Sequence, residues 1–165
     1  MTRAVVLYES VFGNTERIAR AIADGLGESC EVTLAHFGKV SGESDGADLI
    51  VLGGPTHGWG MTKPQSRRQP GSQSYEVGVR EWLEAAPPGR GKTAAAFDTR
   101  FDKPRWMTGS AAIRIRRELE PLGYQMAKPP ESFFVVHMGG PLKDGELERA
   151  KRWGSELAQA FAPCS

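Results

Sequence analysis

The sequence predicts an α/β fold in which helices cover both faces of a parallel β-sheet. Three observations support this fold class. Short apolar segments alternate with segments of helical period, three of the apolar segments are nearly continuous runs, and polar or glycine-rich stretches follow several of them. Strands that are buried on both faces lose the usual apolar-polar alternation. The alternation of strands with helices then favours parallel pairing.

Five segments are expected to form strands, at residues 4–8, 30–34, 48–52, 93–97 and 133–136. Between and after them, apolar residues recur at helical spacing. This spacing predicts helices over residues 15–26, 75–86, 108–122 and 145–161. Residues 41–47 are too short and polar for a full helix, so the second crossover is expected to be a short helix or a loop.

Residues 62–74 have no period and contain two prolines and a glycine, which predicts an exposed excursion from the fold. The chain shows no internal repeat and no composition shift typical of a linker. We therefore expect residues 1–165 to form a single domain, a length within the usual range for one.

The charge, the hydropathy and the spacing of cysteine and histidine argue against several classes of function. The formal net charge is only +1, from 21 basic and 20 acidic side chains, so the basic middle of the chain, residues 51–117, is expected to be a solvated face and not a nucleic-acid site. No apolar run is long enough to cross a bilayer and no signal peptide is apparent, which predicts no membrane partner and a cytoplasmic location. Cys30 and Cys164 form no motif, and His36, His57 and His137 lack metal-ligand spacing, so no metal is expected.

The stretch after the first predicted strand has the features of an anion site. Glu9 is followed by Ser10, Val11, Phe12, Gly13, Asn14 and Thr15, where a helix begins at once. Such a turn offers backbone N–H groups and the positive end of a helix dipole, beside the hydroxyls of Ser10 and Thr15. It therefore predicts a phosphate site that has no lysine. Alternatively, Asn14 or Thr15 is only a helix cap and Gly13 a turn residue.

Two further loops follow predicted strands at the same edge of the sheet. The first contains Gly53, Gly54 and the sequence Pro55-Thr56-His57-Gly58-Trp59-Gly60, in which glycines allow close approach to a flat ligand and Trp59 can stack on it. The second begins Asp98-Thr99-Arg100-Phe101 and leads to Trp106. Ligands of doubly wound sheets bind at this edge, where the strand order reverses.

These three loops resemble those of the flavodoxin family. The family's phosphate loop reads Thr/Ser-x-Thr-Gly-x-Thr, and here it reads Ser10-Val11-Phe12-Gly13-Asn14-Thr15. The resemblance implies a three-layer, doubly wound, five-stranded parallel sheet of order 2-1-3-4-5, with FMN as cofactor. Phe12 departs from the pattern, because a hydroxyl residue usually stands there, and we expect weaker FMN binding as a result.

The resemblance implies the following cofactor-binding residues: Ser10, Val11, Phe12, Gly13, Asn14, Thr15, Pro55, Thr56, His57, Gly58, Trp59, Gly60, Asp98, Thr99, Arg100 and Phe101. The FMN phosphate would be held by Ser10, Gly13, Asn14 and Thr15, and the ring would lie against residues 55–60 and 98–101.

Two other families share this alternation of strands and helices but not these residues. Response-regulator receivers need an acidic pair after the first strand and a phosphoacceptor aspartate after the third, where this chain has Glu9 alone and Gly53. The stretch Gly89-Arg90-Gly91-Lys92-Thr93 imitates the end of a P-loop, but it leads into a strand where a helix should follow.

The residues leave three functions open. The chain is an electron-transfer flavoprotein, an FMN-dependent NAD(P)H or quinone-type oxidoreductase or flavodoxin-type protoporphyrinogen oxidase, or a flavin-free binding module on the same fold. In the second case His57 is a candidate proton donor, although an ordinary loop histidine in hydrogen bonds is the simpler explanation.

The loops expected near the flavin carry an excess of positive charge. They contain Lys63, Arg67, Arg68, Arg100, Lys103 and Arg105, opposed by Asp98 and Asp102. A basic rim suits an acidic redox partner protein or the phosphates of a nicotinamide nucleotide. It should also make an anionic reduced flavin easier to form than in the acidic carriers of the family.

Overall fold

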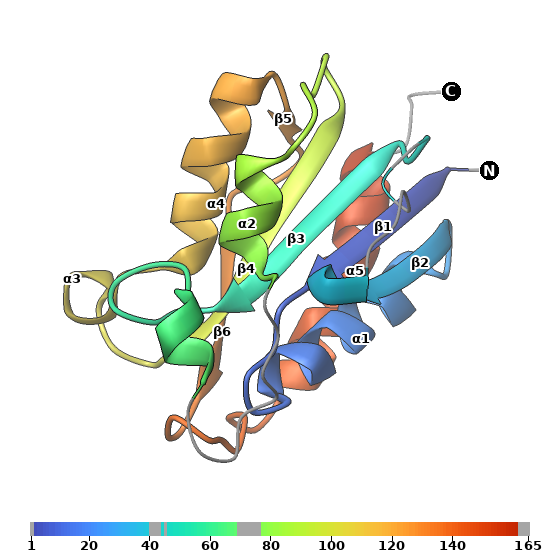
Figure 1. The fold of residues 1–165 in the computed structure, drawn as a ribbon. Coiled ribbons are helices and arrows are strands. Elements are labelled where there is room, and N and C mark those ends of the chain that lie inside the picture. The colour runs from blue at the N-terminus through green and yellow to red at the C-terminus, as the bar shows by residue number, and fades with distance from the viewer. Residues whose placement is uncertain (1, 40–43, 45, 69–76, 162–165) are drawn as a thin grey trace.

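The computed structural model describes residues 2–39, 44, 46–68 and 77–161. A parallel sheet runs through the molecule in the order β2-β1-β3-β4-β5, which confirms the predicted strand order (Figure 1). The strands are β1 (Arg3–Tyr8), β2 (Glu31–His36), β3 (Leu49–Pro55), β4 (Thr93–Phe101), β5 (Gln125–Met126) and β6 (Glu131–Val135). The order reverses at β1 and β3, so this fold has its ligand-binding edge at their carboxyl ends.

The prediction of five strands was wrong in one detail, because two strands share the fifth position. β5 pairs with Thr93 and Ala94 at the start of β4, and β6 pairs with residues 97–101 at its end. The connection between them contains Pro129 and Pro130. Proline has no N–H to donate to the ladder, which interrupts what would otherwise be one edge strand.

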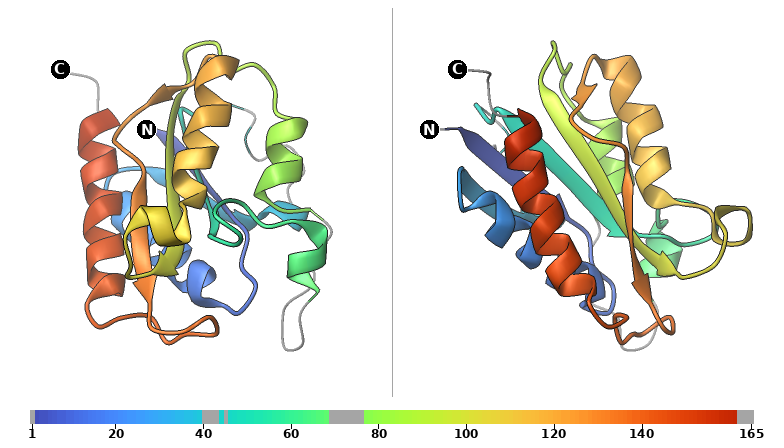
Figure 2. Two further views of the ribbon diagram at one scale, coloured as in Figure 1. Left: turned by 90° about the vertical axis from the view of Figure 1, so that its left-hand side faces the viewer. Right: turned by 180° about the vertical axis from the view of Figure 1, so that it is seen from behind.

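Helices cover both faces of the sheet in three layers. α1 (Asn14–Leu26) and α5 (Glu146–Phe161) lie on one face, and α2 (Val79–Glu84) and α4 (Ala111–Leu119) lie on the other (Figure 2). A single turn, α3 (Arg105–Thr108), follows β4, and short 3₁₀ helices occupy Phe37–Lys39, Pro64–Arg67 and Glu120–Leu122. This is the three-layer α/β arrangement that the sequence predicted.

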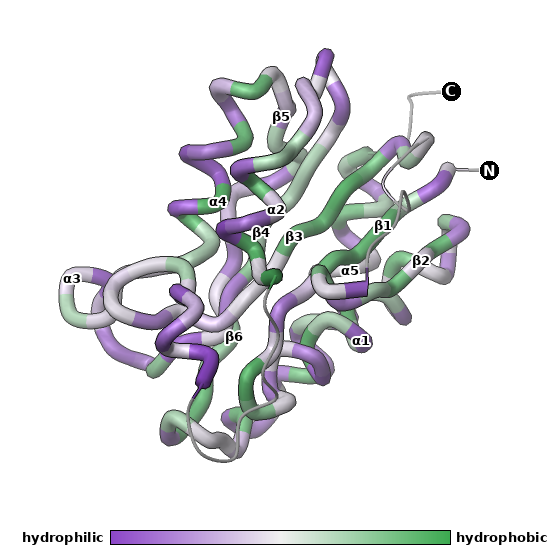
Figure 3. The backbone as a smooth tube through the Cα atoms, in the orientation of Figure 1, coloured by the Kyte–Doolittle hydropathy of each residue, from purple (hydrophilic) through white to green (hydrophobic). Residues whose placement is uncertain are grey.

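Alternate residues of the central strands supply two separate cores. Val6 and Val51 pack toward α1 and α5, whereas Leu7 and Leu52 pack toward α2 and α4. Figure 3 shows β1 and β3 as hydrophobic along most of their length, while the Pro64–Arg67 helix is mainly hydrophilic. Burial on both faces explains why these strands read as continuous apolar runs.

α1 and α5 approach each other closely at two glycines. A Cβ atom on Gly25 would lie 2.0 Å from the Lys151 carbonyl oxygen, and one on Gly154 would lie 2.3 Å from that of Ile22. No side chain fits at either position. Glycine is therefore required here by helix packing and not by a turn.

Two predicted helices begin later than expected. The helix predicted from residue 108 starts at Ala111, because Gly109 has φ +72° and the Ser110 side chain accepts a hydrogen bond from the Ile113 N–H (3.3 Å). Ser110 is thus a helix cap, which separates α3 from α4. The helix predicted over 75–86 spans only Val79–Glu84, and residues 75–76 lie outside the described residues.

Two stretches predicted as loops belong to strands. β3 extends through Gly53 and Gly54 to Pro55, and β4 extends through residues 98–101. A Cβ on Gly53 would lie 2.0 Å from the Phe97 ring, so Gly53 makes room for a core side chain and not for a ligand. The strands therefore carry the candidate residues further along the sheet than expected.

Candidate functional site

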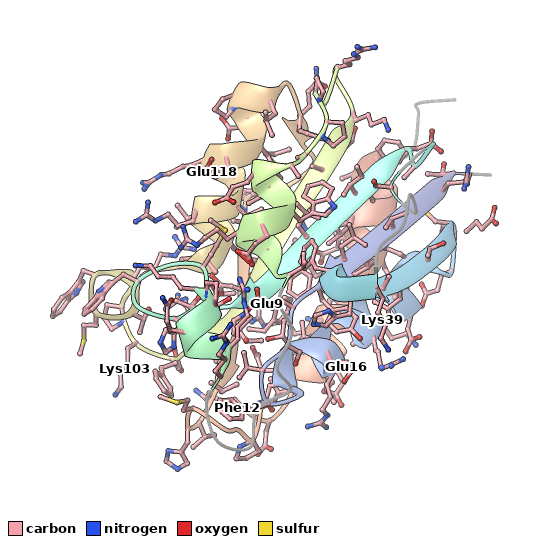
Figure 4. The ribbon with its side chains drawn as sticks, in the orientation of Figure 1. Glu9, Phe12, Glu16, Lys39, Lys103 and Glu118 are labelled. Carbon is pink, nitrogen blue, oxygen red and sulfur yellow. The ribbon has the colours of Figure 1, made fainter. Side chains whose placement is uncertain are left out.

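A cavity of about 290 Å³ opens at the carboxyl ends of β1, β3 and β4. Figure 4 shows this end of the molecule, with Phe12 on the loop before α1 and Lys103 on the loop after β4. Most of the predicted site residues line the cavity: Val11, Phe12, Asn14, Thr15, Pro55, Thr56, His57, Gly58, Trp59, Thr99, Arg100 and Phe101. Ser10, Gly13, Gly60 and Asp98 were also predicted but do not line it.

The loop between β1 and α1 is shaped by Ser10. Its hydroxyl oxygen accepts hydrogen bonds from the N–H groups of Gly13 (3.0 Å) and Glu16 (3.2 Å), and Gly13 has φ +94°. Among the residues that the structure describes, none accepts a hydrogen bond from the N–H of Phe12, Asn14 or Thr15. These donors stand at the positive end of the α1 dipole, a common arrangement for binding a phosphate.

The loop between β1 and α1 is joined directly to β4. The hydroxyls of Thr15 and Thr99 lie 2.7 Å apart, and both residues are buried in the cavity wall. Thr56 completes the connection, since its N–H donates to the Thr99 carbonyl oxygen (2.8 Å). The three predicted loops are thus held together by hydrogen bonds.

Residues 57–60 form a tight two-residue hairpin at the cavity mouth. The His57 N–H donates to the Gly60 carbonyl oxygen (2.8 Å) and the Gly60 N–H donates back (3.2 Å). The two central residues have positive φ, 56° at Gly58 and 65° at Trp59, as in a type I′ turn. A tryptophan in the left-handed region is strained, and such strain concentrates at functional sites. The Trp59 side chain stays 61% exposed beside the cavity.

A buried polar network lies beneath the cavity at the end of β4. The Asp98 carboxylate accepts hydrogen bonds from the Ser110 hydroxyl (2.5 Å) and the Ala112 N–H (3.0 Å), and burial raises the pKa of Asp98. Arg100 donates to the Ser132 hydroxyl (2.9 Å) and the Lys103 carbonyl (2.6 Å), and burial lowers its pKa. Asp98 therefore fixes α4 against β4 and does not face a ligand.

Comparison with known proteins relates the chain to one family. Residues 5–65 match the family described as a flavodoxin domain. A flavodoxin from the domain Archaea superposes with a TM-score of 0.72 and 26% identity, over 97% of this chain and 99% of that one. The chain is therefore similar to flavodoxins in sequence and in fold.

Two further proteins are similar to this chain. Flavodoxin 1 from Bacillus cereus superposes with a TM-score of 0.71 at 20% identity, over 96% of this chain and 98% of that one. The rubredoxin-oxygen oxidoreductase of Megalodesulfovibrio gigas is 23% identical over 165 residues, which are 96% of this chain and 36% of that protein. The chain thus spans about a third of the length of this curated relative.

The basic rim around the cavity is smaller than predicted. Arg67 is not at the surface: its guanidinium lies 3.5 Å from the Glu9 carboxylate and 2.5 Å from that of Glu81, with both the Arg67 and the Glu9 side chains 2% exposed. Arg100 is also buried, as described above. The exposed rim cations are Lys63, Arg68, Lys103 and Arg105.

The segment predicted as an exposed excursion is partly buried because it closes over Glu9. The Thr62 hydroxyl donates to Glu9, and the Val79 N–H donates to the other oxygen of the same carboxylate (3.0 Å). Arg67 in turn donates to the Thr62 hydroxyl oxygen (2.9 Å). Residues 69–74 of the predicted excursion lie outside the described residues.

Sequence reasoning missed the part of the cavity wall that comes from other segments. Thr62 and Ser66, Met107 and Thr108, and Val135 and Met138 also line it. Val135 lies at the end of a strand, and that position could have indicated that it lines the cavity. Met107 follows no strand or motif, and only the fold brings α3 to the cavity.

The structure also bears on two other classes of site. No helix in the described ranges is both long and apolar enough to span a membrane. Within the same ranges, no three histidine, cysteine, aspartate or glutamate side chains gather in a way that could hold a metal ion.

Proposed function

We propose that this chain binds FMN at the carboxyl edge of its sheet and acts in electron transfer. The observation that carries the proposal is the single cavity shared by the loop between β1 and α1, the hairpin at 57–60 and the end of β4. The similarity to flavodoxins in sequence and fold supports the same function. FMN, when bound, supplies reversible electron transfer.

The residues at the start of α1 fit a phosphate group. The N–H groups of Phe12, Asn14 and Thr15 lack acceptors within the described part of the chain, and the helix dipole favours an anion there. The hydroxyls of Ser10 and Thr15 already serve hydrogen bonds inside the protein. Backbone N–H groups would therefore hold most of the phosphate, with the Asn14 side chain beside them.

The remaining walls fit a flat aromatic ring. Trp59 and Pro55 come from one side, and Val11, Met107 and Val135 add apolar surface. Apolar walls exclude water from a bound ring, while the Arg100 guanidinium, also in the wall, favours negative charge on it. These residues would position the ring and bias its charge without forming a covalent bond to it.

The test is a fluorescence titration of the purified protein with FMN and, separately, with riboflavin, which lacks the phosphate. We expect retained flavin absorption after desalting and strong quenching with FMN, with weaker binding of riboflavin. A Phe12→Thr variant should bind FMN about tenfold more tightly through one added charge-assisted hydrogen bond and leave riboflavin binding unchanged. No quenching at micromolar FMN would overturn the proposal in favour of a flavin-free binding module.

A reductase is the second candidate, favoured by the position of His57. This side chain lies in the wall of the cofactor cavity and also in the wall of a neighbouring cavity, where a second ligand could approach. Steady-state oxidation of NAD(P)H with a quinone acceptor, lost in a His57→Ala variant that still retains FMN, would establish it. If the protein retains flavin but shows no such turnover, the result supports an electron carrier and not a reductase.

The surface around the cavity mouth suits docking of a redox partner protein. Trp59, Phe101, Trp106, Met107 and Met138 are all exposed there. Exposed aromatic and methionine side chains are typical anchors of protein interfaces. With Lys103 and Arg105 beside them, the partner we propose carries acidic residues around its contact surface.

A further inference from the structure

A second cavity, of about 610 Å³, lies beside the cofactor cavity. It is enclosed by the segment 57–66, by α2 and by α4, which stand together in Figure 1. His57, Gly58 and Ser66 line both cavities, so a ligand in one would touch the wall of the other. The remaining lining residues are Gly60, Met61, Lys63, Gln65, Arg80, Arg114 and Glu118.

The lining of this second cavity is mostly polar and cationic. Lys63, Arg80 and Arg114 line it together with a single carboxylate residue, Glu118 of α4, which Figure 4 labels. The Arg80 side chain is used within the protein, because it donates to the carbonyl oxygens of Met61 (3.1 Å) and Thr62 (3.2 Å). Within the described ranges, no carboxylate lies within 4.0 Å of Lys63 or Arg114. Two cations are therefore available to an anion.

Arg114 is exposed to solvent in the wall of the second cavity. It belongs to α4, whose next residue, Ile115, is fully buried in the core. Its side chain also lies along Gly60, where a Cβ atom would be 3.4 Å from the Arg114 Cγ and Nε. An exposed guanidinium at this position can donate paired hydrogen bonds to a phosphate.

We propose that this second cavity binds the phosphate group of a nucleotide. Lys63 and Arg114 would hold the phosphate, and the Glu118 carboxylate would accept a hydrogen bond from a ribose hydroxyl, as acidic residues do in other nucleotide sites. The remainder of the nucleotide would extend along His57 and Gly58 toward the cofactor cavity. This goes beyond the proposed function, and the binding does not require a flavin.

The shape and polarity of the cavity favour a small molecule over a protein. Protein interfaces depend on apolar anchors, and in this cavity Met61 is buried and the other side chains are polar. The exposed aromatic side chains lie elsewhere, at the mouth of the cofactor cavity. A concave, polar and cationic surface instead suits a compact anion with hydroxyl groups.

Calorimetric titration with ADP, which carries both ribose and phosphates, tests this proposal. The protein is titrated once saturated with FMN and once without it, alongside the variants Lys63→Gln and Arg114→Gln. Each variant should weaken ADP binding about tenfold or more, because each removes a charged hydrogen bond. Arg117→Gln, which removes an exposed cation of the same helix outside the cavity, should change it less than twofold.

The outcomes separate this proposal from that of FMN binding. If the apoprotein binds ADP with the stated dependence on Lys63 and Arg114, the nucleotide site is established even where no flavin is retained. Absence of ADP binding would overturn the proposal, whatever the FMN titration shows. An equal loss in Arg114→Gln and Arg117→Gln would also overturn it, since that indicates attraction to the general surface charge. Tight binding of an acidic protein that Arg114→Gln abolishes, with no ADP binding, would assign the cavity to a protein partner instead.

Discussion

The side-chain oxygens of Thr15 and Thr99 lie 2.7 Å apart in the wall of the cofactor cavity. Thr15 is in the first turn of α1 and Thr99 is near the end of β4, so the bond joins two segments separated by 84 residues. Each hydroxyl is buried, and each supplies a polar partner that the other needs. The bond therefore fixes the position of the phosphate loop relative to the strand that forms the opposite wall.

Thr99→Val should destabilise the protein, because it leaves the Thr15 hydroxyl buried without this partner. We expect a loss of about 1–2 kcal/mol in the free energy of unfolding, measured by urea denaturation. Thr15→Val should cost a similar amount. The double variant should cost less than the two single losses together, because no unpaired hydroxyl then remains. Simple additivity would show that the two hydroxyls do not interact in solution.

Local sequence patterns predicted the strands and the two covered faces, whereas the strand order came from the resemblance to flavodoxins. Continuous apolar runs such as residues 4–8 identify strands buried on both sides, and the period of residues 15–26 identifies an amphipathic helix. The cavity at the strand ends follows from topology once the strands are known. These features need no knowledge of which distant residues touch.

The burial of Arg67 and the rest of the cavity wall could not be predicted, because they depend on contacts between distant segments. Arg67 lies in a proline- and glycine-rich stretch that reads as exposed, but contacts with distant residues, including its ion pair with Glu9, place it in the interior. Met107 reaches the cavity because Ser110 caps α4 and leaves α3 as a separate turn. No local sequence pattern predicts either of these relationships.

The buried ion pair between Glu9 and Arg67 leads to a prediction about stability. Glu9→Leu should lower the free energy of unfolding by about 3–5 kcal/mol, because it removes the fully buried carboxylate that pairs with the buried Arg67 charge. Arg67→Met should lower the free energy of unfolding by a comparable amount, because it leaves the buried Glu9 carboxylate without this cation. The double variant should recover much of the loss, since a buried pair can often be replaced by apolar residues.

Chemical denaturation of the three variants measures these losses. Arg68→Met is the matched control, because Arg68 is the exposed neighbour of Arg67, and it should change stability by less than about 0.5 kcal/mol. Equal effects of Arg67→Met and Arg68→Met would contradict the burial of Arg67.

His36 leads to a prediction about pH. Burial is the largest cause that lowers its pKa, to about 4 from an unperturbed 6.5, and the neighbouring Lys39 adds to it. Between these values the unfolded chain binds a proton that the folded protein does not, so stability falls as the pH decreases from about 6.5 toward 4. We expect this group alone to cost about 2 kcal/mol between pH 6.5 and pH 5.

Urea denaturation of a His36→Asn variant at both pH values isolates this effect. The Gly38 N–H donates to the His36 Nδ1 (2.9 Å), and an asparagine oxygen can accept a similar bond while carrying no titratable group. The variant should lose overall stability through poorer packing, but its loss between pH 6.5 and pH 5 should be about 2 kcal/mol smaller than that of the original protein. The same loss in both proteins would mean that other groups cause it.

The contact between α1 and α5 predicts an unusual response to a helix-favouring substitution. Alanine in place of glycine normally stabilises a helix by about 1 kcal/mol. Gly154→Ala should instead cost roughly 1–3 kcal/mol, because its Cβ would lie 2.3 Å from the Ile22 carbonyl oxygen. Gln159→Ala, at an exposed position of α5, is the control and should be nearly neutral. A stabilised Gly154→Ala variant would show that the two helices can separate at little cost.

Trp59 connects backbone strain with the proposed ligand. Its φ of 65° costs a side-chain-bearing residue about 1 kcal/mol or more, so Trp59→Gly should leave stability unchanged or raise it by about that amount. The same substitution should weaken FMN binding about three- to tenfold, because it removes an aromatic wall of the cavity.

Trp106→Ala provides the control for Trp59, because Trp106 is 79% exposed and does not line the cavity. This substitution should leave the free energy of unfolding nearly unchanged. It should alter the FMN affinity by less than twofold. Denaturation and fluorescence titration of both variants measure the two quantities independently. If Trp59→Gly gains stability and keeps full FMN affinity, the strained conformation serves the hairpin contact with Gly109 and not the ligand, since those backbones pair directly. If Trp59→Gly instead loses both stability and FMN affinity, the indole stabilises the hairpin by more than the backbone strain costs.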